Sequence, residues 1–135
     1  MEDVRFKARL VAKGYTQRDG VDFNEVFSPV VKHSSIRVLL AIVAKLNLEL
    51  EQLDVKTAFL HGELDVQIYM HQLEGFEIHG KEDHVCLPKK SLYGLKQSLR
   101  QWYKRFDTFM VGNGYCRSAY DSCVYHKKHS NGSYV

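Results

Sequence analysis

The carboxylate of Asp54 is the side chain whose position in this sequence most clearly allows chemistry. It lies near the end of the segment LELEQLDV, residues 48–55, where leucines alternate with polar residues, and a turn is expected directly after it. A carboxylate at the end of a buried strand can hold a hard cation such as Mg²⁺, because such cations prefer oxygen ligands. Aspartates at strand ends also commonly cap turns and helices, so the spacing leaves both interpretations open.

Charge is unevenly distributed along the chain, although the net charge of the 135 residues is only +3. Acidic residues dominate between positions 49 and 83, whereas lysine and arginine dominate between positions 87 and 128. An acidic stretch beside a basic one is compatible with a metal site next to a phosphate-binding surface. Ordinary solvated faces produce the same pattern, and composition does not separate the two.

Other kinds of chemistry find less support in the residues. The three cysteines, at positions 86, 116 and 123, are an odd number without repeating spacing, which indicates reduced thiols rather than a secreted disulfide framework. Cys116, Cys123, His126 and His129 match no common zinc-finger spacing. No P-loop, dinucleotide-binding glycine pattern or Gly-x-Ser-x-Gly elbow occurs. With no apolar run long enough for a membrane span and a charged N-terminus, the sequence predicts an intracellular globular domain.

Two helices are predicted to position these side chains. The first follows Ser34 or Ser35, either of which can cap its N-terminus, and the second spans Leu95–Val111 and ends at residues 112–114, where glycine permits the left-handed C-cap. Both rest on apolar residues at helical spacing. These are Ile36, Leu39, Leu40, Val43 and Leu46 in the first helix and Leu95, Leu99, Trp102, Phe106 and Phe109 in the second.

Short strands are predicted between the helices and at both ends of the chain. Alternating or β-favouring residues indicate strands at residues 6–13, 48–55, 67–70, 84–87 and 122–127. The clearest turns are Asp19-Gly20 and Asn131-Gly132, the second being a strong hairpin signal. Only three residues follow Gly132, so the return strand is expected to be cut short and to leave backbone groups unpaired, as in a domain that continues past Val135.

Four blocks of the sequence, in their order and spacing, resemble the reverse transcriptase domain of copia-type LTR retrotransposon Pol polyproteins. They are KARLVAKGYTQRDGVDFNEVFSPV, QLDVKTAFLHGEL, IYMHQLEGF and LPKKSLYGLKQSLRQWY. The resemblance runs from about Phe6 to Val135. It implies an α+β right-hand polymerase fold in which an antiparallel palm sheet packs on the Leu95–Val111 helix, and residues 1–135 would form the fingers and the first part of the palm.

The resemblance also implies a reaction and a metal cofactor. Such an enzyme uses two Mg²⁺ ions to transfer a deoxynucleotide to a primer on an RNA or DNA template. Asp54 would be the first catalytic, metal-binding aspartate, and the backbone carbonyl of Val55 would be a further ligand. Phe59 falls where the family places an aromatic steric gate against a ribose 2′-hydroxyl, although an ordinary core phenylalanine would fit the same pattern.

Further residues are implied for the nucleotide and the nucleic acid. Lys7, Arg9 and Lys13 lie in the block that resembles the strand contacting the triphosphate; Arg9 is preferred because a guanidinium binds phosphate bidentately, and register decides which of them points inward. Tyr93 and Gly94 resemble the turn beside the nascent base pair, where glycine permits close backbone approach. Four basic side chains could contact template-primer phosphates or simply be solvated. These are Lys96, Arg100, Lys104 and Arg105.

The sequence departs from the family pattern in ways that bear on activity. Leu73 and Leu99 stand where members usually carry proline, and no Asp-Asp pair occurs, since the Tyr-x-Asp-Asp turn of the family would fall beyond Val135. Asp54 alone offers too few carboxylates for two metal ions, so the isolated chain is expected to be an inactive fragment. The alternative is a non-catalytic nucleic-acid-binding remnant with steeply salt-dependent affinity. Either would be cytoplasmic, in a virus-like particle, or nuclear.

Overall fold

The computed structural model of the chain describes residues 6–130 and 132–135 and combines helices with short strands. In chain order its elements are the 3₁₀-helix η1 (Gly14–Thr16), α1 (His33–Leu46), the 3₁₀-helix η2 (Ala58–His61), β1 (Met70–His71), β2 (Val85–Cys86), α2 (Ser98–Gly112), β3 (Cys116–Arg117) and β4 (Tyr125–His126). The strands form two separate antiparallel pairs, β1 with β2 and β3 with β4. The mixed α+β class is confirmed, whereas the division into palm and fingers stays a prediction.

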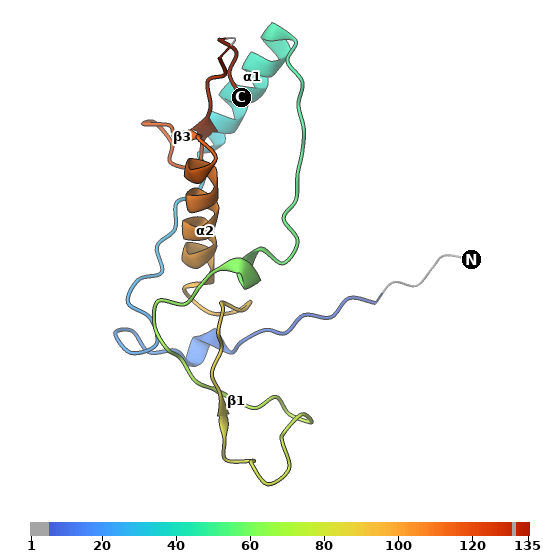
Figure 1. The fold of residues 1–135 in the computed structure, drawn as a ribbon, viewed down its shortest axis with the longest axis vertical. Helices are drawn as coiled ribbons and strands as arrows, with labels where there is room; N and C mark the ends of the chain where they lie inside the picture. The colour runs from blue at the N-terminus through green and yellow to red at the C-terminus, as the bar shows by residue number, and fades with distance from the viewer. Residues whose placement is uncertain (1–5, 131) are drawn as a thin grey trace, which may run out of the picture.

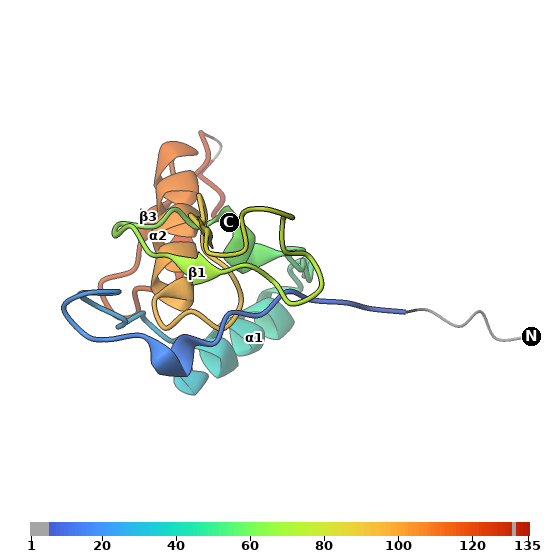
Figure 2. The same cartoon turned by 90° about the horizontal axis from the view of Figure 1, so that it is seen from below.

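The molecule is elongated, with α2 running along its middle. Figure 1 shows α1 towards one end and the loop that joins β1 to β2 at the other, and Figures 1 and 2 both show the first described residues extending away from the body. The small hydrophobic core is formed by Ala12, Ile68 and Leu95, three residues from distant parts of the sequence. None of the helices in the described part of the chain is long and apolar enough to cross a membrane.

The helix α2 confirms the second helical prediction but begins three residues late. Gly94 has a positive φ of 88°, and the residues after it form a turn rather than helix, so Leu95 is buried ahead of the first turn of α2. Ser98 Oγ closes this turn by donating to the Leu92 carbonyl at 2.5 Å. At the other end the helix stops at Asn113, and Gly114 follows at φ 80°, as the glycines predicted.

The helix α1 confirms the first helical prediction, but its predicted cap is wrong. Lys32 occupies the N-cap position, and neither serine side chain bonds back to the first turn. Instead the Lys32 N–H donates to Asp121 Oδ2 at 2.9 Å, and the Ser35 hydroxyl donates to the same oxygen at 2.7 Å. A carboxylate from the far end of the sequence thus binds the N-cap residue and Ser35 at the start of α1, in place of the bond expected from a serine side chain.

Two predicted strands do not form. Residues 48–55 are extended without a partner strand in the described chain, and Leu53 is 87% exposed. Residues 6–13 contribute only a parallel bridge between Val11 and Tyr93. Alternation predicts a strand only where a neighbour accepts its backbone hydrogen bonds and covers its apolar face, and neither condition is met here.

The remaining strands are shorter than predicted, and β3 was missed. In place of the strand predicted at residues 67–70, the structure has β1, in which Met70 pairs with Cys86. The strands β2 and β4 lie inside their predicted ranges. The return strand after the last turn does pair, contrary to expectation, since Lys127 and Val135 exchange two backbone hydrogen bonds of 2.6 and 3.0 Å. Asn131, half of the predicted turn, lies outside the described residues, as does most of the charged N-terminus. The three thiols are free, as expected.

Candidate functional site

Three segments that are distant in sequence meet at Tyr93. The Phe59 ring stands edge-on to the Tyr93 ring, with centroids 5.1 Å apart and planes at 72°. The Arg9 guanidinium lies over the Tyr93 ring, 5.9 Å from its centroid. Three of the residues predicted to bind a nucleotide are therefore in one group, which we call the Tyr93 cluster: Arg9, Phe59 and Tyr93.

Backbone contacts hold Tyr93 against the N-terminal segment. The Ala12 N–H donates to the Tyr93 carbonyl at 2.7 Å, beside the bridge between Val11 and Tyr93. Gly94 makes this approach possible, because a Cβ there would overlap the Ala12 carbonyl oxygen. Gly94 thus permits a close backbone approach to the protein's own Ala12, while its place beside a nascent base pair stays a prediction.

The register of the N-terminal segment places Arg9, and neither of the two neighbouring lysines, against Tyr93. Lys7 and Lys13 are exposed and make no side-chain contact with the cluster. Arg9 is also exposed, and no carboxylate pairs with it within the described residues. Its charge is therefore available to an anion, and a guanidinium can bind phosphate oxygens through two hydrogen bonds.

Asp54 is exposed at the point where the extended segment 48–53 runs into a turn. The turn is present, with Thr57 at φ 54°, but the buried strand that was to carry Asp54 is not. Nor does Asp54 act as a cap, because within the described chain its carboxylate makes no hydrogen bond or ion pair and η2 has no side-chain cap. Its neighbour Val55 is exposed as well. The carboxylate is thus free to take a ligand.

The residues present do not by themselves fit a two-ion magnesium centre. Among the described residues, no three side chains of His, Cys, Asp or Glu lie close enough to hold a metal ion. Two ions bridged at a reacting phosphate need several carboxylates that converge from different elements. Asp54 and the Val55 carbonyl offer one carboxylate and one neutral oxygen.

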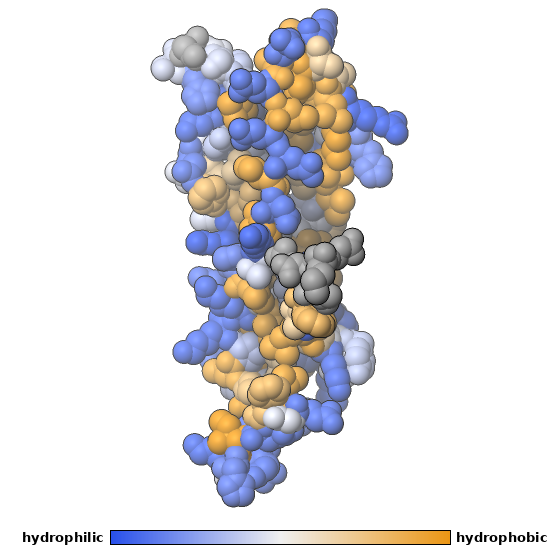
Figure 3. Space-filling model, turned by 90° about the vertical axis from the view of Figure 1, so that its right-hand side faces the viewer, coloured by the Kyte–Doolittle hydropathy of each residue, from blue (hydrophilic) through white to orange (hydrophobic). Residues whose placement is uncertain are grey.

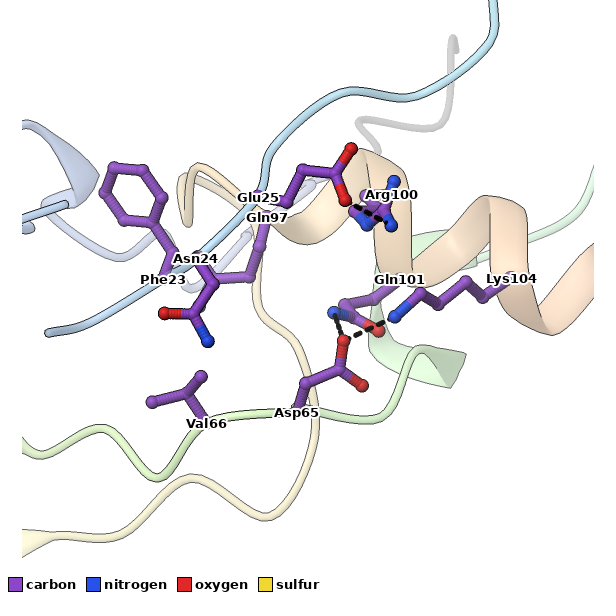
Figure 4. A pocket seen from close by; sticks show the side chains of 9 residues that line it. All are labelled: Phe23, Asn24, Glu25, Asp65, Val66, Gln97, Arg100, Gln101 and Lys104. Carbon is purple, nitrogen blue, oxygen red and sulfur yellow. Dashed lines mark hydrogen bonds and ion pairs between the residues drawn. The ribbon is translucent and has the colours of Figure 1, made fainter. Parts of the chain in front are cut away.

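Two basic residues of α2 are paired with carboxylates of the chain itself, as Figure 4 shows around a pocket of about 140 Å³. Arg100 pairs with Glu25 at 2.5 Å and donates to the Phe27 carbonyl at 2.9 Å. Lys104 pairs with Asp65 at 2.5 Å. These contacts neutralise two of the four cations that were predicted to contact template-primer phosphates.

The other two predicted cations differ from each other. Lys96 Nζ lies over the Phe23 ring, 4.9 Å from its centroid, and donates to the Gln17 carbonyl at 3.2 Å, so its charge is not cancelled by a carboxylate. Arg105 is exposed and has no side-chain partner in the described part of the chain. Of the four, these two keep a charge that phosphate could use.

Sequence reasoning missed Asp65, which organises this pocket. Its Oδ2 accepts from Lys104 Nζ and, at 2.9 Å, from Gln101 Nε2. The hydrogen bond from Lys104, followed by that from Gln101, lowers the pKa of Asp65. The available signal was that Gln101 and Lys104 are three residues apart on a helix and so share a face.

Asp121 was also missed, and no local signal could have found it. The residue is buried, and beside its two bonds to Lys32 and Ser35 it accepts from the Cys123 N–H at 3.0 Å. The hydrogen bond from Ser35, then those from the two backbone N–H groups, lower its pKa. Its partners at the start of α1 lie 86 and 89 residues away.

The aromatic side of α2 contains one thiol, that of Cys123, among the residues that line its pocket. An apolar pocket of about 370 Å³ there includes Trp102, Phe106, Tyr125 and Cys123 in its lining. Burial, followed by the nearby charge of Asp121, raises the pKa of the Cys123 thiol. A thiol in such surroundings stays protonated and is a poor nucleophile.

Comparison with known proteins places these features in a family context. Over residues 1–135 the chain matches the family described as "Reverse transcriptase (RNA-dependent DNA polymerase)". It is 58% identical over 132 residues to the Retrovirus-related Pol polyprotein from transposon TNT 1-94 of Nicotiana tabacum, which covers 98% of this chain and 10% of that protein. It is 45% identical over 121 residues to the corresponding polyprotein from transposon RE2 of Arabidopsis thaliana, covering 90% of this chain and 8% of that one.

A more distant similarity extends to yeast. The chain is 30% identical over 109 residues to the Transposon Ty1-BL Gag-Pol polyprotein of Saccharomyces cerevisiae, covering 81% of this chain and 6% of that protein. The chain thus spans a tenth or less of the length of these relatives. No solved structure matches it.

Proposed function

Because the chain belongs to the reverse transcriptase family of copia-type retrotransposon Pol polyproteins, we propose that it supplies the nucleotide-facing part of an RNA-directed DNA polymerase. In that reaction the oxygen of a primer 3′-hydroxyl forms a bond to the α-phosphorus of a deoxynucleoside triphosphate. The bond from that phosphorus to pyrophosphate breaks, and the hydroxyl proton is lost. Residues 1–135 would contribute the fingers and the first part of the palm.

The Tyr93 cluster is the observation that carries this proposal. It joins an arginine without a carboxylate partner among the described residues to two half-buried aromatic rings, so that a cation for the triphosphate lies near the Phe59 ring that would meet the sugar. In this proposal Arg9 binds phosphate oxygens and Phe59 meets the 2′ position of the sugar. Lys7 and Lys13, on either side of Arg9, add positive charge along the same segment.

Asp54 supplies one carboxylate to the active centre, and we assign it the catalytic, metal-binding role, with the backbone carbonyl of Val55 as a further metal ligand. The family generally uses Mg²⁺, which in a polymerase activates the primer hydroxyl and stabilises the departing phosphate. Since the described residues offer one such carboxylate, further carboxylates have to join Asp54 from elsewhere. We therefore propose that the 135-residue chain does not polymerise by itself.

The test is primer extension on an RNA template with Mg²⁺. It compares the 135-residue chain with a longer Pol segment that continues through the Tyr-x-Asp-Asp turn and the remaining C-terminal regions. We expect incorporation by the longer segment alone, and its loss to below a hundredth of the original rate with Asp54→Asn, since catalytic charge stabilisation is typically worth that much. Glu51→Gln, on the same exposed segment, is the matched control and should stay active.

Three results would contradict this proposal in different places. Incorporation by the 135-residue chain would show that it needs no further carboxylates. Full activity of Asp54→Asn in the longer segment would remove Asp54 from the reaction. A folded longer segment that incorporates nothing, but binds nucleic acid without metal and with a steep salt dependence, would support the non-catalytic remnant instead.

Template-primer contacts form a smaller part of the proposal. Arg105 and Lys96 keep charges that no carboxylate cancels, so we propose that they contact phosphates, while Arg100 and Lys104 support the fold. Removing one phosphate contact lowers the slope of log affinity against log salt by about 0.9. Arg105→Gln should do this in a binding titration, whereas Lys104→Gln should not.

A further inference from the structure

We infer that Tyr93 is a positioning residue for sugar selection: its ring holds the Phe59 ring in the orientation that an incoming ribose 2′-hydroxyl would meet. The inference rests on the proposed function, in which Phe59 faces the sugar, and it adds a residue that need not touch the sugar at all. It starts from the contact between the two rings and from the backbone contacts that hold Tyr93 in place.

Phe59 lies in η2, a single 3₁₀ turn of four residues that follows Thr57 in a left-handed conformation and ends at Gly62. The Leu60 N–H donates to the Thr57 carbonyl at 2.9 Å, and the Gly62 N–H donates to the Phe59 carbonyl at 3.2 Å. The turn packs against α2, and the Gly62 carbonyl accepts from the Ser91 N–H at 2.8 Å. These contacts place the backbone of the turn, and among the described residues the aromatic contact of the Phe59 ring is with Tyr93.

Backbone contacts hold Tyr93 against the N-terminal segment. Its carbonyl accepts from Ala12, its backbone bridges Val11, and Gly94 packs directly under the Ala12 carbonyl. The Arg9 guanidinium lies over its ring. A ring held in this way can orient the ring of Phe59, because an edge-to-face contact, as seen at 5.1 Å and 72°, is favourable at particular angles and lost at others.

The ring of Tyr93 carries this role, and its hydroxyl does not. Within the described residues the hydroxyl makes no hydrogen bond, so nothing in the protein depends on its oxygen. The edge-to-face contact requires only the aromatic ring. Tyr93→Phe keeps the edge-to-face contact and should keep the sugar discrimination, whereas Tyr93→Leu should release Phe59 and lower it.

The experiment measures kcat/KM for dCTP and for CTP in the active longer Pol segment. Their ratio is the sugar discrimination. We expect Tyr93→Leu to lower it by roughly threefold to tenfold, the range that corresponds to loss of one aromatic pair, and Tyr93→Phe to leave it unchanged. Phe59→Ala should lower it further. Tyr69→Leu removes an exposed tyrosine without an aromatic partner and is the matched control.

A double-mutant cycle separates positioning from direct contact. If Tyr93 acts through Phe59, the double variant Tyr93→Leu/Phe59→Ala should discriminate no worse than Phe59→Ala alone. Multiplicative losses in the double variant would mean that Tyr93 meets the sugar itself and would overturn the inference. Unchanged discrimination in Tyr93→Leu, or a loss in Tyr93→Phe, would overturn it as well.

Failure of the proposed function would look different from failure of the inference. No incorporation by the unaltered segment would contradict the function, whereas normal incorporation and sugar selection that ignore Tyr93 would contradict the inference alone. Nuclear Overhauser contacts between the ring protons of Phe59 and Tyr93 give a second measurement that does not depend on activity or on the Leu variant. Their presence supports the positioning contact, and their absence in the folded protein overturns it.

Discussion

The two helices are nearly equal in length, at 14 and 15 residues, yet they relate to the rest of the molecule in opposite ways. No residue of α1 is buried, and apolar side chains gather on the surface at its end of the molecule, as Figure 3 shows. The less hydrophobic α2 buries Ser98 and Gln101 and packs against η2 and β3. In this chain, the packed helix α2 differs from the exposed helix α1 in its polar contacts rather than in a higher apolar content.

The polar contacts of α2 explain why the segments around this helix depend on it. Gln97, Arg100 and Lys104 hold segments from residues 17–27 and from Asp65, so each turn of the helix fastens a different part of the chain. By contrast, α1 is joined to the C-terminal region through the carboxylate of Asp121 and the bond from Lys32 Nζ to the Tyr120 carbonyl. Changes near α2 should therefore disturb the whole fold, and changes at Asp121 should disturb α1 alone.

The largest effect is expected from Gly94→Ala in the turn that leads into α2. The new methyl group would overlap the Ala12 carbonyl, and the backbone would have to keep a positive φ. Together these should lower the free energy of unfolding by about 3 kcal/mol. Urea denaturation measures this. Gly75→Ala is the control, since it shares the positive φ but faces open space, and should cost about 1 kcal/mol. Equal losses would show that the close approach to Ala12 is not important.

The next largest effect is expected at the first turn of α1. Asp121→Ala removes the acceptor for the Lys32 N–H and the Ser35 hydroxyl, so the first turn of α1 should fray. We expect protection of the α1 amides from hydrogen exchange to fall roughly fivefold to tenfold while α2 keeps its protection. Asp19→Ala, far from α1 along the chain, should leave both helices as they were. Equal loss of protection in α1 and α2 would show that the two helices unfold together and that Asp121 does not act on α1 alone.

Low pH should have the same effect on α1 as Asp121→Ala. Because its hydrogen bonds lower the pKa of Asp121 in the folded chain, its contribution to stability is present above the unfolded value of about 3.9 and is lost as pH falls through the lower folded value. Protection factors of α1 should thus be constant from pH 7 to about 5 and fall below about pH 4. In Asp121→Asn this acid step should vanish from α1; its persistence there would assign the step to another group.

The smallest effect is expected at the ion pair between Asp65 and Lys104. Both side chains are about half exposed, so solvent screens their attraction. Asp65→Asn should lower the free energy of unfolding by about 0.5 kcal/mol, and a double-mutant cycle with Lys104→Met should assign a similar value to the pair. A loss several times larger would show that α2 depends on this pair as strongly as on its close backbone contacts.

The residues of the Tyr93 cluster could be named from the sequence but their assembly could not, and their role in binding a nucleotide stays a prediction. Arg9, Phe59 and Tyr93 were identified one by one from the blocks that resemble the family, and the structure brings the three together. What could not be predicted is that Tyr93 lies between the other two, because that depends on the parallel bridge to Val11. Asp65 and Asp121 escaped for the same reason, since their partners are remote in sequence.

The sequence alone determined both helices and the turns at Gly20 and Gly114, because helical hydrogen bonds and glycine conformations depend on residues within a few positions of each other. The strands that it predicted at residues 6–13 and 48–55 do not form, since alternation needs a neighbouring strand to become structure. Only the tertiary structure decided that Asp121 binds the start of α1, that Glu25 and Asp65 neutralise two cations of α2, and that the Tyr93 ring contacts the Phe59 ring. Each of these joins residues tens of positions apart, and such pairings depend on how the whole chain packs.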